Sequence, residues 1–125
     1  IVYFVRKTFF MEISKDLFEL LLPNFIVNNF TFIKSNSSDE HLHLYFEEKN
    51  DRSFFQDKNV ESKGFHKEII IEDFPLRGKL VYLHVKRRRW RDIDTKQSLQ
   101  RDWNTIAKGT RMTEEFAIFL KEINR

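Results

Sequence analysis

A run of cations interrupted by one tryptophan carries the most distinctive chemistry in this sequence. Its six consecutive positions are Lys86, Arg87, Arg88, Arg89, Trp90 and Arg91. Arginine presents planar, paired N–H donors that match phosphate oxygens and the edge of guanine. An indole among arginines can stack on a base or wedge between base pairs. The run is therefore typical of a surface that binds nucleic acid.

Alternation along a strand decides how such a run can be placed. Successive side chains of a strand point to opposite faces, so this run projects cations from both faces. Neither face can then be buried in an apolar core, and we predict that the run meets water or a polyanion. An alternative is a solvated edge strand whose charges prevent aggregation, with Trp90 as a partly buried anchor.

The charge of the chain is concentrated around this run. The net charge is only +3 at pH 7, yet residues 77 to 111 carry 11 of the 22 basic side chains and 3 of the 19 acidic ones. This asymmetry is the electrostatic footprint expected of a protein that binds a polyanion. We therefore add the flanking cations to the predicted nucleic-acid-binding set: Arg77, Lys79, Arg101, Lys108 and Arg111.

Two of these cations stand just before the last predicted helix. The backbone N–H groups that begin a helix can bind a phosphate, and Lys108 and Arg111 would add charge to such a site. A glycine-containing linker before a threonine cap is equally ordinary chemistry for the start of a helix, and both interpretations stay open.

Metal chemistry has weaker support. The chain has no cysteine, which removes disulfides, thiolate zinc sites and cysteine nucleophiles. His41 and His43 share a strand face and could ligate a metal with His66 or His84, but imidazoles at this spacing are more often plain surface residues. We predict no metal and no cofactor.

Enzymatic activity is not predicted either. The aspartates at positions 92, 94 and 102 are more simply interpreted as turn formers and ion-pair partners than as a cation site. The sequence contains no phosphate-binding loop, nucleophile elbow or Ser/His/Asp signature. We expect no catalytic residue and no small-molecule substrate.

The first half of the chain predicts helices followed by a hairpin. Leucines at helical spacing after Ser14 predict a helix, and Pro23 opens a second short helix that ends at Asn28 and Asn29. Residues 30 to 34 and 41 to 48 alternate in polarity and predict a β-hairpin. Residues 49 to 64 are predicted to form a loop.

The second half predicts strands and a final helix. Residues 67 to 73 form a β-branched strand, and residues 74 to 78 turn into a strand that runs from Lys79 to Arg91. After a turn at residues 92 to 97, the chain returns and brings Arg101 and Trp103 beside the basic strand. A last helix begins at Thr113, with acidic residues in its first turn.

These elements predict an α+β fold. It has an N-terminal helix or helix pair, a mainly antiparallel sheet of four to five strands with a long basic β-hairpin, and a C-terminal helix. We expect one domain over residues 11 to 125. Because the first methionine is Met11, residues 1 to 10 are interpreted as a non-native or extended N-terminus. Neither a signal peptide nor a membrane span is indicated, and we expect a cytoplasmic protein.

Several motifs over residues 60 to 124 carry a resemblance to a known family. The segments VESKGF, DFPLRGKLVYLHVKRRRWRD, RDWN and AKGTRMTEEFAIFLKEI resemble the N-terminal-region proteins of an ISAon-type bacterial insertion-sequence transposase family. With DLFELLLPNF and LHLYFEEK, the resemblance covers Met11 to Arg125. It implies the DNA-binding half of a split transposase, which recognises the terminal inverted repeats of a mobile element. The catalytic acidic triad for transposition would lie in a partner subunit.

A wider set of transposases shows a similar order of motifs and resembles a zinc ribbon. In this chain Asp92 and Thr95 occupy the positions where that ribbon has cysteines. The resemblance then implies a ribbon without zinc, in which Phe54, Phe55 and Trp103 would stabilise the knuckle by packing.

Two other functions remain open. An RNA-binding module would use Tyr82 and Trp90 as platforms on which bases stack. A protein-interaction subunit would dock its basic ribbon on an acidic surface of the catalytic partner.

Overall fold

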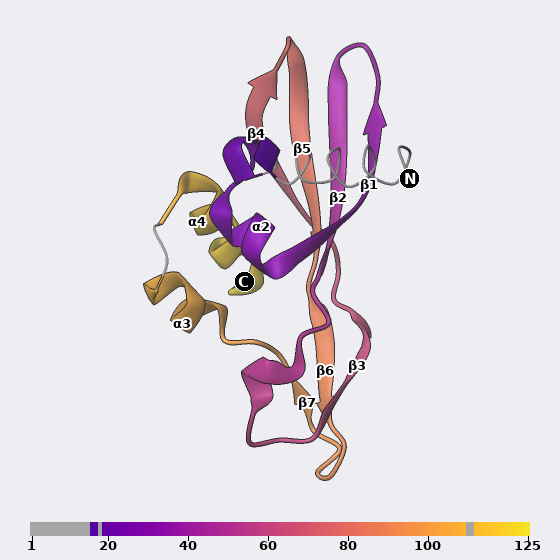
Figure 1. The fold of residues 1–125 in the computed structure, drawn as a ribbon, viewed down its shortest axis with the longest axis vertical. Helices are drawn as coiled ribbons and strands as arrows, with labels where there is room; N and C mark the ends of the chain where they lie inside the picture. The colour runs from indigo at the N-terminus through magenta and orange to yellow at the C-terminus, as the bar shows by residue number, and fades with distance from the viewer. Residues whose placement is uncertain (1–15, 18, 110–111) are drawn as a thin grey trace, which may run out of the picture.

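The structure, a computed structural model, describes residues 16–17, 19–109 and 112–125. In this part of the chain the fold is α+β, which confirms the prediction (Figure 1). One sheet has four strands in the order β1-β2-β5-β4, and a smaller sheet has three in the order β3-β6-β7. No helix in the described part is long and apolar enough to cross a bilayer.

Helices precede the first strand, as predicted. Residues 16–17 and 19–21 are helical, while the predicted start at Ser14 and the whole of residues 1 to 10 lie outside the described part. Helix α2 (Asn24–Asn29) begins directly after Pro23. Proline suits this place because the first helical N–H groups have no partner within the helix.

The four-stranded sheet contains the predicted hairpin. Strand β1 (Phe30–Ser37) pairs with β2 (His41–Glu48) in antiparallel fashion, and β4 (Ile69–Leu76) pairs likewise with β5 (Lys79–Lys86). The two pairs are joined by β2 and β5, which run parallel. Arg77 and Gly78 link β4 to β5 with φ of 53° and 78°, the left-handed conformation that two-residue hairpin loops require.

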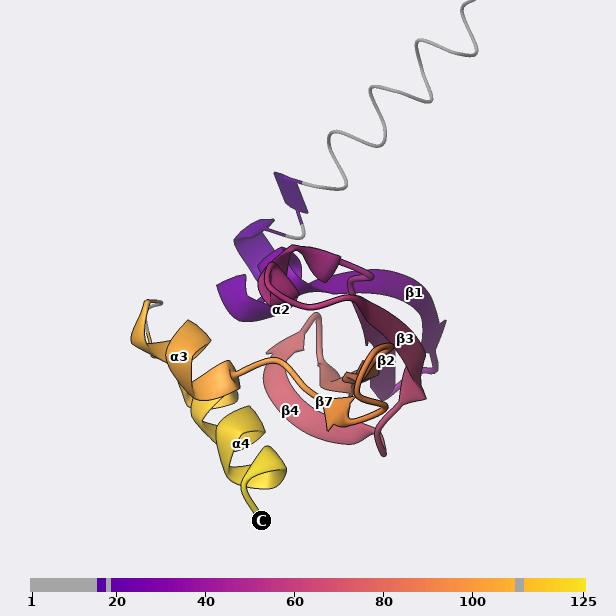
Figure 2. The same cartoon turned by 90° about the horizontal axis from the view of Figure 1, so that it is seen from below.

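One face of this sheet packs against helices. Helices α3 (Trp103–Lys108) and α4 (Glu114–Ile123) lie together on one side of the strands (Figure 2). Rings interlock there: Phe25 of α2 stacks on Phe116 of α4 with centroids 4.4 Å apart. Burial of each phenylalanine side chain stabilises the fold by about 1.5–3 kcal/mol relative to its exposure to water. The innermost side chains of this core are Phe25, Ile26, Ile71, Val81, Leu83, Val85, Phe116 and Phe119.

The predicted C-terminal helix is confirmed at its start. The Thr113 side chain accepts a hydrogen bond from the Phe116 backbone N–H at 3.2 Å, and Glu114 and Glu115 occupy the first turn of α4. Threonine caps a free N–H in this way, and the two carboxylates favour the positive end of the helix.

The smaller sheet corrects the prediction of a loop over residues 49 to 64. This segment contains the short 3-10 helix η1 (Arg52–Phe55) and most of strand β3 (Val60–Phe65). Strand β3 pairs with β6 (Arg88–Asp92). The sequence of β3 lacks the regular alternation of polar and apolar residues that predicts a strand. The reason is that its pairing with β6 shifts between Ser62 and Phe65, where Gly64 has a φ of 83°.

The long basic hairpin is also corrected. The predicted strand from Lys79 to Arg91 divides at Arg87 into β5 and β6, which belong to different sheets. Strand β7 (Ser98–Leu99) pairs with β6 over only two residues. The chain then leaves the sheet instead of returning along it, and Asp102 caps α3 by accepting the Thr105 N–H at 3.1 Å.

Candidate nucleic-acid interface

The alternation of burial reverses where the basic strand divides. In β5 the odd-numbered Val81, Leu83 and Val85 are buried in the main core, whereas in β6 the even-numbered Trp90 and Asp92 are buried and Arg89 is exposed. The side chains still alternate, but a different face of the strand is covered in each sheet. Arg89 and Arg91 therefore share the outer face of β6, and Arg88 shares the inner face with Trp90.

Four cations meet on this outer face. Lys63 of β3, Arg89 and Arg91 of β6, and Lys96 of the β6–β7 turn line a hollow of about 360 Å³, together with Ser98 and Trp90. Lys63 and Lys96 were missed by the sequence analysis because they come from a predicted loop and a turn. We call this hollow, defined by its four cations, the basic hollow.

The charge of the basic hollow is only partly balanced. Lys63 forms an ion pair with Glu61 at 3.3 Å, and Glu61 lies opposite Arg91 in the β3–β6 pairing. Both side chains of the pair are well exposed, so the pair contributes little stability. Among the residues that the structure describes, Arg89, Arg91 and Lys96 form no ion pair. The hollow keeps a surplus of positive charge.

Arg88 is held within the protein. Its Nε donates a hydrogen bond to the Glu48 backbone carbonyl at 2.7 Å, and its Nη1 donates to Ser62 Oγ at 3.0 Å. The guanidinium also lies over the Phe65 ring, 4.9 Å from the centroid. These contacts tie β6 to β2 and β3, so Arg88 serves the junction between the two sheets.

Trp90 is buried as well, with 1% of its surface exposed. Its indole N–H donates to Glu48 Oε2 at 2.8 Å, and its ring packs on Phe55 at a centroid distance of 5.4 Å. A ring enclosed in this way cannot stack on a base. The geometry favours the alternative interpretation, in which Trp90 is an anchor.

Glu48 is the acceptor around which this junction is built. It is 1% exposed, and its Oε1 also accepts the Arg88 backbone N–H at 3.3 Å. Burial raises the pKa of Glu48, while the Trp90 hydrogen bond and the charge of Arg101 oppose that rise. The sequence held one signal for it: Glu48 follows Leu44 and Phe46 at the same spacing, on the inward face of β2.

Arg101 lies inside the fold and does not line the basic hollow. Only 5% of its surface is exposed, and its guanidinium lies 3.4 Å from the centroid of the Phe54 ring. Its Nη2 donates to Asn29 Oδ1 at 3.0 Å. Burial lowers the pKa of Arg101, opposed by the charge of Glu48. The predicted place of Arg101 on a basic hairpin is therefore corrected.

The aromatic packing expected around a zinc-free knuckle is present only in part. Phe55 does pack on Trp90, but Trp103 belongs to the main core, where it stacks on Phe30 at 5.4 Å. The turn itself is held by Asp92, whose Oδ1 accepts the backbone N–H groups of Asp94 and Thr95 at 2.9 and 3.2 Å. Hydrogen bonds that Asp92 accepts thus shape the segment where the ribbon family has cysteines.

Two further cations of the basic run lie outside the hollow. Arg87 is half-buried, its Nη1 donates to Gln100 Oε1 at 2.9 Å, and burial lowers its pKa. Lys86 is half-buried on the face of β5 that carries Tyr82 and His84. Neither residue is among those that line the basic hollow.

The flanking cations are divided between distant parts of the fold. Arg77 and Lys79 stand at the β4–β5 turn, at the opposite end of the long axis from the small sheet (Figure 1). Lys79 Nζ donates there to Ser37 Oγ at 2.6 Å. Lys108 is exposed at the end of α3, and Arg111 lies outside the described residues. The predicted cations thus do not form one continuous patch.

Comparisons with known proteins returned nothing for this chain. It matches no protein-family model, no curated protein and no solved structure.

Proposed function

We propose that the chain binds DNA through the basic hollow. The observation that carries this proposal is the convergence of Lys63, Arg89, Arg91 and Lys96 around one concave surface. Phosphate groups supply most of the affinity of proteins for nucleic acid, because each neutralised phosphate releases counterions. A hollow lined by four cations suits the placement of a phosphate backbone.

The scaffold around the hollow supports the same proposal. Arg88 and Trp90 face inward and fix β6 to Glu48, so Arg89 and Arg91 project from an anchored strand. The small sheet also forms a narrow end of the molecule (Figure 1). Proteins that read DNA with strands place a ribbon or a small sheet in a groove, where arginines can reach guanine edges.

The biological role that we propose is the non-catalytic, DNA-binding part of a split insertion-sequence transposase. It rests on the resemblance of residues 60 to 124 to N-terminal-region proteins of that family. The DNA would be the terminal inverted repeat of the element, and a partner subunit would supply the catalytic carboxylates.

The two other functions have less support in the geometry. Trp90 is buried, and Tyr82 is half-buried with its ring stacked on His43 at 5.2 Å, so neither ring is free in the way a base-stacking platform requires. Docking on an acidic protein surface would use the same basic hollow. Nucleic-acid binding is the alternative that predicts a salt dependence set by phosphate contacts.

The test is a binding titration at several salt concentrations. The full chain is titrated with a duplex of the terminal inverted repeat, an unrelated duplex and an RNA of matched length. The Arg89→Ala/Arg91→Ala variant should lower the slope of log K against log salt by about 2, one for each phosphate contact removed. The matched control, Lys121→Ala/Arg125→Ala, removes two exposed cations, one in α4 and one just after it, and should leave the slope unchanged.

Each outcome decides between the functions. Tighter binding of the inverted repeat than of the unrelated duplex supports the transposase role, and equal binding of both duplexes leaves a DNA-binding protein without that specificity. Tighter binding of RNA favours the RNA-binding alternative. Absence of salt-dependent binding to all three, or equal slopes in the variant and its control, refutes the basic hollow as a nucleic-acid site.

A further inference from the structure

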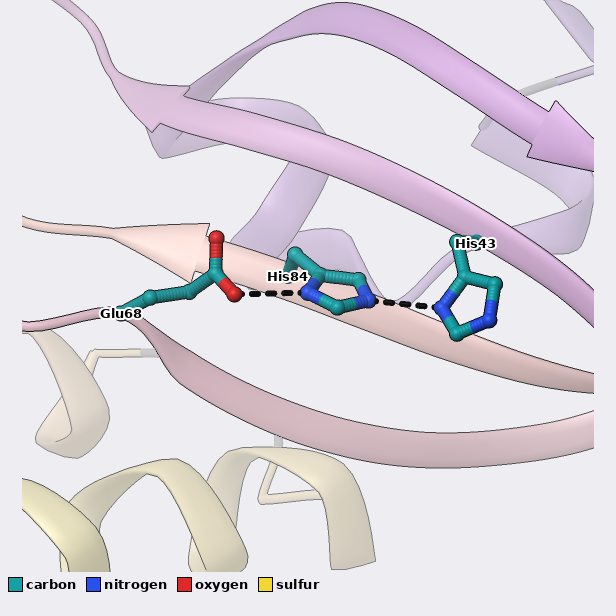
Figure 3. Close-up of polar contacts among 3 residues, drawn as sticks. All are labelled: His43, Glu68 and His84. Atoms are coloured by element: carbon teal, nitrogen blue, oxygen red, sulfur yellow. Dashed lines mark hydrogen bonds and ion pairs between the residues drawn. The ribbon is translucent and has the colours of Figure 1, made fainter.

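A chain of two hydrogen bonds crosses the face of the four-stranded sheet opposite the main core (Figure 3). Glu68, just before β4, contacts His84 of β5 at 2.7 Å between Oε1 and Nδ1. The other ring nitrogen of His84, Nε2, lies 2.8 Å from Nδ1 of His43 on β2. Two neighbouring strands and the residue just before a third therefore contribute to this series of hydrogen bonds.

The positions of the protons in this chain follow from its acceptor end. A carboxylate has no proton to donate, so His84 Nδ1 carries the hydrogen that Glu68 accepts. In a neutral His84, Nε2 then has a lone pair and must accept from His43. His43 donates through Nδ1–H, which leaves its own Nε2 with a free lone pair. Glu68 thus sets the tautomer of His43 through the two hydrogen bonds that His84 makes.

The rings that carry this chain are held in place by stacking. Tyr45 lies on His84 with centroids 4.3 Å apart, and Tyr82 lies on His43 at 5.2 Å. His84 is buried beneath its neighbours, whereas His43 is half-buried at the surface of the sheet. The accessible end of this series of hydrogen bonds is therefore His43. The stacked rings hold its imidazole in one orientation before any ligand binds.

A second imidazole stands beside that accessible end. His41 precedes His43 by two residues on the same face of β2, is half-buried, and its ring centroid lies 6.3 Å from that of His43. Two imidazoles adjacent on one strand face can share a metal ion. Neutral imidazole is a preferred ligand of Zn²⁺, and a metal-binding histidine usually donates its other N–H to a carboxylate or another acceptor.

We propose that His41 and His43 bind a divalent transition-metal ion, for which Zn²⁺ is the representative. His43 binds through Nε2, and His84 with Glu68 behind it forms the outer shell that orients this ligand. The described residues contain no group of three or more histidine or acidic side chains arranged around one metal position, so solvent completes the coordination. The sequence alone led to the prediction of no metal, because the tautomer of His43 depends on contacts with His84 and Glu68 that only the fold creates.

The test is isothermal titration of the full chain with zinc sulfate alone near neutral pH, in a buffer that does not bind metal. Wild type should bind one Zn²⁺ saturably. His43→Phe and His41→Phe keep an aromatic ring in the stack and remove the ligand, so each should abolish or sharply weaken binding. Glu68→Ala removes the acceptor and should weaken binding by about 10- to 100-fold, the usual effect of losing an outer-shell partner.

The controls separate a metal site from a structural ladder of rings. His66→Ala removes an imidazole outside the proposed site and should leave Zn²⁺ binding unchanged. Far-UV circular dichroism and thermal unfolding check that each variant is folded. Absence of saturable binding in wild type, or full binding in folded His43→Phe, overturns the site. Wild-type affinity in folded Glu68→Ala overturns the role of the hydrogen-bonded chain. None of these readouts depends on nucleic acid.

Discussion

The Trp90 indole N–H donates to Glu48 Oε2 at 2.8 Å, and this bond joins the small sheet to the large one. Both side chains are almost fully buried. A buried carboxylate is tolerated only when its oxygens are hydrogen-bonded, and here Trp90 and the Arg88 backbone N–H supply the donors. The position of the basic hollow depends on this junction, because β6 carries both the buried Trp90 and the outward-facing Arg89 and Arg91.

Removal of the acceptor should destabilise the protein strongly. Glu48→Ala leaves the Trp90 and Arg88 donors buried without a partner and opens a cavity, and we expect a loss of about 3 kcal/mol in the free energy of unfolding. Glu48→Gln retains one acceptor and should lose about 1 kcal/mol. Urea unfolding measures both. Glu47→Gln, at the half-buried neighbour on the other face of β2, is the control, and a loss as large as that of Glu48→Ala would contradict the role of Glu48 at the junction.

Substitutions of Trp90 and Arg89 should have opposite effects: the first should lower stability and leave DNA binding unchanged, and the second should weaken DNA binding and leave stability unchanged. Trp90→Phe keeps the packing on Phe55 but loses the donor to Glu48, so we expect a loss of about 1–2 kcal/mol in unfolding free energy and an unchanged salt slope for duplex binding. Arg89→Ala should change stability by less than about 0.5 kcal/mol and lower the slope by about 1. A Trp90→Phe variant that remains stable but loses salt-dependent binding would restore the base-stacking role.

Arg101 should behave as an interior residue. Arg101→Ala loses the hydrogen bond to Asn29 and the contact with the Phe54 ring, and we expect a cost of about 2 kcal/mol in unfolding free energy. The exposed Arg125→Ala serves as its control and should cost less than about 0.5 kcal/mol. Chemical denaturation of both variants checks this. Equal stability would place Arg101 outside the interior network.

Stability should fall as pH rises through the titration of Asp73. Burial, followed by the nearby Glu115, raises the pKa of Asp73 from 3.8 to about 6, against the hydrogen bond from the Phe74 backbone N–H. A carboxyl group with a raised pKa holds its proton more tightly in the folded state, so its stabilising effect is complete below pH 3.8 and is lost as pH rises to about 6. Because Asp73 is partly exposed, we expect Asp73→Asn to raise the free energy of unfolding by only about 1 kcal/mol at neutral pH.

The check on Asp73 is a pair of unfolding curves, one at neutral pH and one near pH 3.8. The gain from Asp73→Asn should disappear at the lower pH, where the wild-type side chain is protonated. The adjacent, exposed Glu72→Gln is the control and should show no such pH dependence. A gain of equal size at both values would contradict the raised pKa.

Binding of nucleic acid should raise the pKa of His66. That pKa is lowered first by burial and then by the charges of Arg87 and Arg89. A phosphate at Arg89 would offset this repulsion, so binding would take up protons and affinity would increase as pH falls below the ordinary histidine pKa of 6.5. NMR titration of the imidazole with and without duplex measures the change. Loss of the pH dependence in His66→Ala would support it, and an unchanged pKa on binding would refute it.

Much of the secondary structure could be predicted from the sequence. Alternation of apolar residues along β2 and β5, the threonine before α4 and the two residues at the β4–β5 turn each mark local structure, because periodicity, capping and left-handed φ are properties of neighbouring residues. The clustering of half the cations in residues 77 to 111 was equally plain. Local patterns therefore determined the α+β class and the region that carries positive charge.

The composition of the candidate site was decided by tertiary structure. Alternation tells which side chains share a face of a strand, but not which face will be covered, and in β6 the face that bears Arg88 and Trp90 is covered by Glu48 and Phe55. Lys63 and Lys96 join Arg89 and Arg91 only because β3 and the β6–β7 turn lie beside β6. The parallel pairing of β2 with β5 likewise brings His43 to His84, although 41 residues separate them. Long-range pairing and burial are set by the whole chain, and no local pattern encodes them.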